Sequence, residues 1–175
     1  MSKTDIWDQY FLFLSLFWST KSPDSSTKCG CVLTRDNVVL STGYNGIMSG
    51  VDHRVFQEWM HTRPEKYELF LHGEENAIIQ CAKHGIATDG CTCYLPGIPC
   101  LRCISRLQRA GCVRIVYTNF NTPVICTSDV DKKMREAIIK AAESQGVTFE
   151  FIHSKDLDNT PIVEVLEVHQ KAQKS

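Results

Sequence analysis

Two short stretches, HGE at residues 72–74 and PCLRC at residues 99–103, decide how the middle of this chain folds. Together they supply one imidazole and two thiols, from His72, Cys100 and Cys103. A catalytic zinc ion takes three protein ligands and leaves its fourth position to water, whereas a structural zinc ion closes its shell with a fourth Cys or His. The spacing therefore predicts a catalytic Zn²⁺ site, one ion per chain, that draws the two stretches together.

Glu74 follows the histidine by two residues and is not needed as a metal ligand. A carboxylate beside an activated water is suited to moving protons during a hydrolytic reaction. We therefore interpret Glu74 as the catalytic general acid and base. The alternative is a carboxylate that only stabilises the N-terminus of a helix.

Composition points to one globular domain over residues 1–175, with a core of about 4–152 and a polar tail at 153–175. The chain is 43% hydrophobic and has a net charge of −1, so it can form a core but lacks the basic surface typical of nucleic-acid binding. We find no signal peptide and no apolar run long enough for a membrane. We expect a cytoplasmic protein that binds neither nucleic acid stably nor a membrane, with its nine cysteines reduced.

Hydrophobic periodicity predicts helices and strands in alternation. Expected helices cover residues 6–18, 72–85, 99–111 and 128–146, the last with a capping box formed by Ser128 and Asp131. Expected strands cover 29–34, 38–42, 91–95, 113–118 and 147–152, the first two joined by a hairpin turn at 35–37. The stretch from 46 to 71 reads as irregular. A hairpin followed by alternating elements predicts an α/β fold, a three-layer α/β/α sandwich around a mixed five-stranded sheet.

Two details of this pattern predict burial. In the first helix the apolar residues recur at helical spacing, with Asp5 and Asp8 on the opposite side. The apolar positions are Ile6, Trp7, Tyr10, Phe11, Leu14, Phe17 and Trp18. We expect the apolar stripe to face the sheet. The cysteine pairs 29/31 and 91/93 each share one face of a strand, where free cysteine packs as a small hydrophobic residue.

Longer stretches around these residues resemble the deoxycytidylate deaminase family over roughly residues 4–152. They are SSTKCGCV at 25–32, STGYNG at 41–46 and HGEENAI at 72–78, and the H-x-E…P-C-x-x-C pattern is the signature of zinc nucleobase deaminases. The resemblance implies a cytidine-deaminase-like fold, conversion of dCMP to dUMP for dTMP synthesis, and a homohexamer. It also implies activation by dCTP and inhibition by dTTP, each triphosphate carrying Mg²⁺.

The same resemblance suggests residues that bind the substrate. Asn45 occupies the family position that binds deoxyribose, although an asparagine here could serve only the turn. Lys28 lies where the family holds the substrate phosphate, with a solvated lysine as the alternative. Phe120 stands where the family usually has a tyrosine over the mouth of the site, and it could stack on a base.

A second nucleotide site is the regulatory expectation. Gly43, Tyr44 and Gly46 lead into the long irregular stretch, which carries Arg54 and several other cationic or titratable side chains: His53, His61, Arg63 and Lys66. Long loops in compact domains are often functional. A solvated loop explains the charges equally well.

Two departures from the family pattern bear on the site. Gly73 stands where the family generally has alanine, and we expect the missing methyl group to make room against the base. Glu75 replaces a residue that is usually apolar. Four other functions stay open: a dual dCMP/dCTP deaminase, a tRNA or other nucleic-acid deaminase, a free-base or nucleoside deaminase, and a non-catalytic zinc-binding assembly protein.

Overall fold

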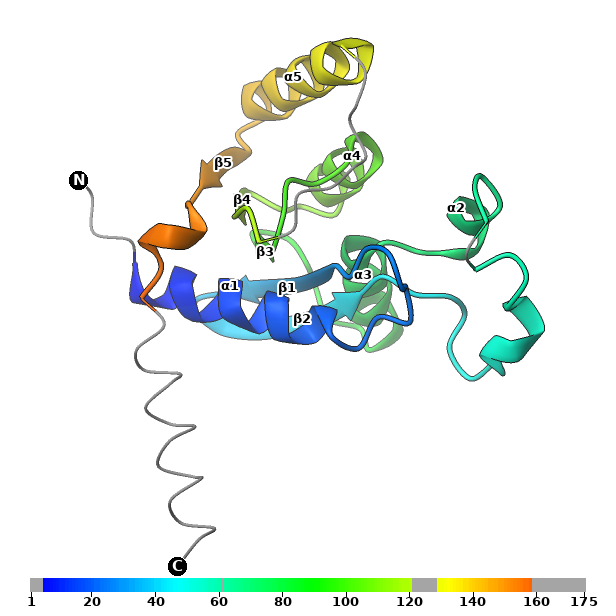
Figure 1. Ribbon diagram of the computed structural model, residues 1–175. Helices are drawn as coiled ribbons and strands as arrows, with labels where there is room; N and C mark the ends of the chain where they lie inside the picture. Colours follow the sequence, from blue (N-terminus) through cyan, green and yellow to red (C-terminus); the bar gives the residue numbers. More distant parts are fainter. Residues whose placement is uncertain (1–4, 61, 121–128, 159–175) are drawn as a thin grey trace, which may run out of the picture.

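The computed structural model describes residues 5–60, 62–120 and 129–158, and within these a mixed sheet forms the centre of the fold (Figure 1). Its strands are β1 (Gly30–Arg35), β2 (Val38–Tyr44), β3 (Thr92–Leu95), β4 (Arg114–Tyr117) and β5 (Thr148–Phe151), in the order β2-β1-β3-β4-β5. β1 runs antiparallel to β2 and β3, while β3, β4 and β5 are parallel. The five predicted strands and the mixed sheet are confirmed.

The predicted hairpin turn joins β1 to β2. Asp36 and Asn37 both have positive φ, 52° and 60°, the backbone that a two-residue turn matched to the twist of a hairpin requires. Asp and Asn adopt this left-handed conformation more readily than other non-glycine residues.

Helices cover both faces of the sheet. On one face lies α1 (Ile6–Ser19), and on the other lie α3 (Gly73–Lys83), α4 (Leu101–Arg109) and α5 (Asp129–Ser144). Alternate strand residues point to opposite faces. Leu33, Cys93 and Ile115 therefore join the core under α3–α5, and their neighbours Val32, Tyr94 and Val116 join the core under α1. The three-layer sandwich is confirmed.

Most of the cysteines fill the core as predicted. Cys31, Cys91 and Cys93 are fully or almost fully buried, and Cys81 and Cys112 lie in the same cluster. Cys29 is only half-buried, and it directly precedes the start of β1.

The stretch between β2 and α3 leaves the sheet and returns to it (Figure 1). It contains a 3-10 turn at His53–Phe56 and the short helix α2 (Lys66–Leu69), where the sequence predicted irregular chain. Its two ends are paired, because Gly46 and Leu71 exchange two backbone hydrogen bonds of 3.0 and 2.9 Å. A second 3-10 turn, Ser154–Asp156, follows β5. Ser128, predicted to cap α5, lies outside the described residues.

The buried face of α1 is only partly the predicted one: Phe11 joins the core and Leu14 packs against it, as expected. Trp7, Tyr10 and Phe17 are 46%, 43% and 62% exposed, while Asp8 is 3% exposed. The helix approaches so closely that a Cβ at Gly30 would lie 2.0 Å from the carbonyl oxygen of Ser15. The small side chains of Ser15 and Ser19 therefore face the sheet near the end of α1, whereas Trp7, Tyr10 and Phe17 remain largely exposed.

Asp8 is buried because its charge is paired. Arg114 on β4 donates two hydrogen bonds to its carboxylate, both 2.7 Å long, and the Tyr94 hydroxyl donates a third, also 2.7 Å. Burial by itself would raise the pKa of Asp8, but these donors outweigh it and hold the pKa below its ordinary value. The ion pair thus ties α1 to two central strands.

We predict that Asp8→Asn lowers the free energy of unfolding at pH 7 by about 2 kcal/mol, because it leaves a half-buried arginine with one partner fewer. Glu150→Gln is the matched control. Glu150 pairs with the same Arg114 but is 47% exposed, so its loss should cost less than about 1 kcal/mol. Urea denaturation of the three proteins measures both values.

The pH dependence has a defined sign. Since the folded-state pKa of Asp8 is depressed, its contribution is present above the unfolded pKa of about 3.9 and is lost as the pH falls through the folded value. The difference in the free energy of unfolding between wild type and Asp8→Asn should therefore become smaller at acid pH. A gap that stays constant from pH 7 to pH 3 contradicts this assignment.

Candidate metal centre and nucleotide pocket

The predicted metal ligands meet at the N-termini of two helices. His72 is the N-cap of α3 and Cys100 the N-cap of α4, with Cys103 in the first turn of α4. The His72 Nδ1 atom lies 3.5 Å from Cys100 Sγ and 3.4 Å from Cys103 Sγ. Among the described residues, these three side chains form a cluster whose ligand atoms all lie within 4.8 Å of one another.

This arrangement fits a zinc ion. With ordinary Zn–N and Zn–S bonds in a tetrahedral shell, the nitrogen and sulfur ligands are about 3.6 Å apart, close to the distances from Nδ1 to the two sulfur atoms. The donor set of one imidazole and two thiols also matches three-ligand catalytic sites, which keep a position for water.

The local electrostatics favour a thiolate. Contact with Cys103 and with the His72 imidazole lowers the pKa of Cys100 to about 3, and the positive end of the α4 dipole acts in the same direction. The two sulfur atoms share a proton, so the pKa of Cys103 is raised, first by Cys100 and then by burial. A divalent cation displaces such a proton when it binds.

Glu74 lines the same pocket as His72 and Cys100 and is 3% exposed. Burial raises the pKa of its carboxyl group, and the neighbouring His72 opposes part of that shift. A raised pKa favours a carboxyl group that can accept and return a proton. Glu74 therefore stays a candidate for proton transfer in this pocket.

Glu75, the second departure from the family pattern, joins the two ligand-bearing helices. Its Oε2 atom accepts a hydrogen bond of 2.8 Å from the backbone N–H of His72, and its Oε1 atom pairs with Arg106 Nη1 on α4 at 2.9 Å. The carboxylate therefore holds the N-cap of α3 and contacts α4 at once.

Glycines allow α3 to begin so close to the sheet. A Cβ at Gly43 would lie 2.1 Å from the carbonyl oxygen of Gly73, so only glycine fits under the helix start. A Cβ at Gly73 would meet the carbonyl oxygen of Cys29 at 3.2 Å. The missing methyl group at position 73 thus faces the backbone at the start of β1, and the expectation that it makes room against a base stays a prediction.

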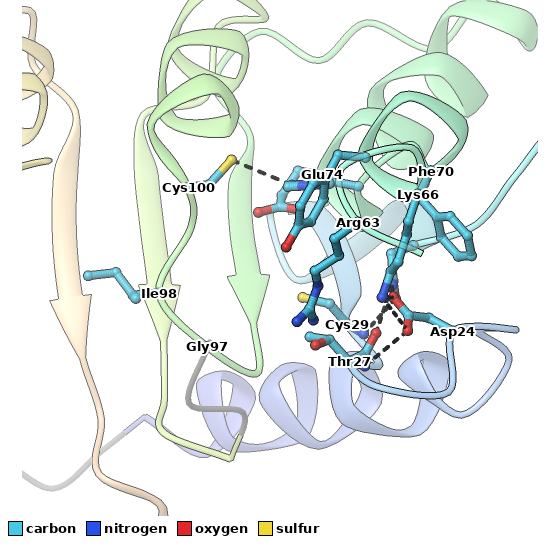
Figure 2. A pocket seen from close by; sticks show the side chains of 13 residues that line it. Asp24, Thr27, Cys29, Arg63, Lys66, Phe70, Glu74, Gly97, Ile98 and Cys100 are labelled. Carbon is cyan, nitrogen blue, oxygen red and sulfur yellow. Dashed lines mark hydrogen bonds and ion pairs between the residues drawn. The ribbon is translucent and has the colours of Figure 1, made fainter. Parts of the chain in front are cut away.

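One pocket is lined by two of the three metal ligands, His72 and Cys100, and extends away from them (Figure 2). Its cavity volume is about 80 Å³. Its wall opposite the ligands comes from the segment before β1, with Asp24 and Thr27, and from the segment that contains α2, with Arg63 and Lys66. Neither wall segment belongs to the sheet.

Of the three residues predicted to bind the substrate, Asn45 lines this pocket and Lys28 and Phe120 do not. Asn45 lines the pocket and is 7% exposed. Its Nδ2 donates to Asp24 Oδ2 at 3.2 Å and to the carbonyl of Thr27 at 2.8 Å, while its Oδ1 accepts from the backbone N–H of Cys29 at 2.7 Å. Both amide protons are therefore used within the protein, and Oδ1 keeps one lone pair for a ligand.

Lys28 and Phe120 are not among the residues that line this pocket. The ammonium group of Lys28 donates to the carbonyl of Ser22. The ring of Phe120 packs against Phe13 of α1, with 5.9 Å between centroids. The structure thus brings Asn45 to the metal centre and gives the other two side chains neighbours elsewhere.

The residues suggested for a second nucleotide site are spread along the chain. Gly43 lies under α3, Gly46 pairs with Leu71, and the Tyr44 side chain is 38% exposed. Arg54 is exposed and forms an ion pair with Asp52, with 2.6 Å between Nη2 and Oδ2. The side chains of His53 and His61 lie outside the described residues.

A buried ion pair in the pocket wall was missed from the sequence. Lys66 Nζ lies 2.7 Å from a carboxylate oxygen of Asp24 and 2.6 Å from Ser26 Oγ, and both charged side chains are almost fully buried. Burial would raise the pKa of Asp24, but hydrogen bonds from Lys66 and from the backbone of Ser26 and Thr27 hold it below its usual range. The two residues are 42 positions apart, so no local pattern indicates the pair.

None of the helices in the described ranges combines the length and the apolar content that crossing a membrane requires.

Relatives of known name share this chain's sequence. ComE operon protein 2 of Bacillus subtilis is 28% identical over 151 residues, which is 86% of this chain and 74% of that protein. The probable deoxycytidylate deaminase of Caenorhabditis elegans is 36% identical over 112 residues, 62% of this chain and 55% of that protein. This chain therefore aligns with little more than half of the nematode protein.

A solved structure and a family model agree with these relatives. The dCMP deaminase from the cyanophage S-TIM5, solved in complex with dCMP and dUMP, superposes with a TM-score of 0.61 at 22% identity, covering 82% of this chain and 95% of that chain. This likeness shows the cytidine-deaminase-like fold. Residues 5–119 match the family model described as the cytidine and deoxycytidylate deaminase zinc-binding region. Since that match spans well over half of the sequence and includes the whole His/Cys/Cys cluster, the chain belongs to the cytidine and deoxycytidylate deaminase family.

Proposed function

We propose that this protein catalyses the hydrolytic deamination of dCMP to dUMP and ammonia, supplying dUMP for dTMP synthesis. The observation that carries the proposal is the buried carboxylate of Glu74 in one pocket with His72 and Cys100. Relatives named as deoxycytidylate deaminases, and the phage dCMP deaminase with dCMP and dUMP bound, support this choice of substrate.

In this mechanism His72, Cys100 and Cys103 hold zinc, which when bound activates water for attack at neutral pH. Glu74 accepts a proton from the attacking water and delivers it to the ring nitrogen next to the amino-bearing carbon, making that carbon more electrophilic. The same carboxylate then takes the remaining proton from the hydroxyl group now on that carbon and passes it to the departing amine. Water is consumed, the C–N bond breaks, and the products are a ring carbonyl and ammonia.

Asn45 is proposed to bind the deoxyribose through the free lone pair of Oδ1, as acceptor from a sugar hydroxyl. Its three hydrogen bonds within the protein orient that oxygen toward the pocket. The proposed stacking of Phe120 on the base stays a prediction from the family resemblance, as does the phosphate contact of Lys28.

Substituting Glu74 separates chemistry from metal binding. We predict that Glu74→Gln keeps about one zinc per chain, because three other side chains bind the metal. We expect turnover of dCMP to fall by about 10²–10⁴-fold, the usual contribution of a general acid and base. Metal analysis and ammonia release on the same sample measure both. Loss of zinc from this variant would show that the carboxylate is a ligand.

Substituting a ligand should give the opposite combination. Cys100→Ala and Cys103→Ala each leave two ligands, so we expect zinc content and turnover to disappear together. Lys83→Gln, at an exposed position near the end of α3, is the control for effects of mutation and purification. It should retain both zinc and turnover. A cysteine variant that deaminates dCMP without zinc rules out the proposed metal centre.

Other substrates remain as alternatives to dCMP. Ammonia release from dCMP, dCTP, CMP, deoxycytidine and an RNA hairpin distinguishes a dual nucleotide deaminase, a nucleoside deaminase and a nucleic-acid deaminase. A chain that binds zinc and deaminates none of them would be a zinc-binding assembly protein.

We further propose a homohexamer regulated by nucleotides, with dCTP activating and Mg²⁺-bound dTTP inhibiting. The exposed aromatic side chains of α1, including Trp7 and Phe17, offer apolar surface for contacts between subunits. The stretch between β2 and α3 ends directly at His72. A triphosphate that binds one conformation of this stretch more tightly would change the position of α3 and the turnover.

Initial rates test the regulation. We predict sigmoidal dependence on dCMP, inhibition by dTTP with Mg²⁺ and relief by dCTP, with coupling of about 1–3 kcal/mol, equivalent to about 5–150-fold in apparent affinity. Light scattering of the same samples measures the size of the assembly. Hyperbolic curves unaffected by either triphosphate contradict the regulatory proposal and leave the catalytic one standing.

A further inference from the structure

The pocket has chemically different ends. His72, Glu74 and Cys100 line one part of the pocket, where the metal and proton-transfer site is proposed. Arg63 lines it from the segment before α2, and Figure 2 shows Arg63 on the opposite side of Glu74 from Cys100. Figure 2 shows the Arg63 side chain extending across the pocket toward Thr27 and Cys29. A substrate that reacts at the first end therefore presents its far end to a guanidinium.

The charge of Arg63 is not balanced within the described part of the chain. The ion pairs found there join Lys66 to Asp24, Arg54 to Asp52, Arg106 to Glu75, and Arg114 to Asp8 and Glu150. The nearest recorded contact of the Arg63 guanidinium is the ring of Tyr67, with 5.9 Å between Cζ and the ring centroid. An aromatic face orients a guanidinium without neutralising it.

The other cations close to the pocket have partners. Lys66 lines the pocket, but its ammonium group contacts the Asp24 carboxylate at 2.7 Å and Ser26 Oγ at 2.6 Å. Lys28 donates to the carbonyl of Ser22 and does not line the pocket. Arg63 is thus the pocket cation best placed to meet an added negative charge.

The segment that carries Arg63 is held in place by a backbone hydrogen bond and by the buried ion pair of Lys66 with Asp24. Lys66 donates its backbone N–H to the carbonyl of Thr62 at 3.0 Å, so the chain turns once between them. The buried pair of Lys66 with Asp24 then fixes this turn to the segment before β1. A guanidinium on an anchored turn loses less conformational freedom when it binds than one on a free loop.

We propose that Arg63 binds the 5′-phosphate of the nucleotide substrate and thereby selects nucleotides over nucleosides. This inference rests on the proposed deamination of dCMP. The planar guanidinium donates two parallel hydrogen bonds to a phosphate, which an ammonium group does not. It assigns to Arg63 the contact that the family resemblance suggested for Lys28.

The test compares kcat/KM for dCMP and for deoxycytidine in wild type, Arg63→Gln, Arg63→Lys, Lys28→Gln and Lys83→Gln. We expect Arg63→Gln to lower kcat/KM for dCMP by about 10–100-fold, the range of charge-assisted hydrogen bonds, mainly through a higher KM. Deoxycytidine should be unaffected, because it has no phosphate. Arg63→Lys should recover part of the loss, and Lys83→Gln should match wild type.

The outcomes separate this inference from the proposed function. Wild type that deaminates neither compound refutes the function. Wild type that prefers dCMP, with the preference intact in Arg63→Gln, refutes the role of Arg63 alone, and a preference lost only in Lys28→Gln returns the phosphate to Lys28. An equal loss for both compounds in Arg63→Gln, with an unchanged melting temperature and zinc content, also overturns the inference, because it shows an effect on the chemistry.

Discussion

The close approach of the α3 N-terminus to the sheet is the constraint on which the site depends. Gly43 on β2 leaves space for the carbonyl of Gly73, where any side chain would collide. His72 and Glu74 are brought to the sheet edge by the same contact, and α4 begins beside them with Cys100. The link from Glu75 to Arg106 then joins the two helices. The arrangement of the three candidate zinc ligands therefore depends on backbone packing as much as on their spacing in the sequence.

The metal centre could be predicted from sequence because its information is local. His72 and Glu74 are two residues apart at the start of α3, and Cys100 and Cys103 lie three residues apart at the start of α4. Strand alternation likewise predicts that Val32 and Leu33 face opposite layers, because successive side chains of a strand point to opposite faces of the sheet. Fold and ligands thus follow from patterns a few residues long.

The pocket wall could not be predicted in this way. Asp24 and Lys66 come from segments without regular periodicity, and they become partners only when the chain has returned from β2 to α3. The predicted buried face of α1 was only partly right for a related reason. Amphipathic spacing correctly favours burying Phe11, but it also favours burying Trp7 and Phe17. Arg114 instead supplies a partner for a buried Asp8, and Gly30 lets the backbone of α1 approach the sheet closely. Long-range pairing outweighed the local pattern in both places.

The buried pair of Asp24 and Lys66 has a consequence for how such proteins diversify. It lies in the two segments that form the pocket wall, whereas the zinc ligands lie at the starts of α3 and α4. Changes of length or sequence in the wall can therefore accumulate without disturbing the reactive centre, provided that the two charges are kept or lost together, because either alone would be stranded away from water. An engineer who wants a new substrate would transplant the stretch between β2 and α3 as a unit, together with its acidic partner before β1.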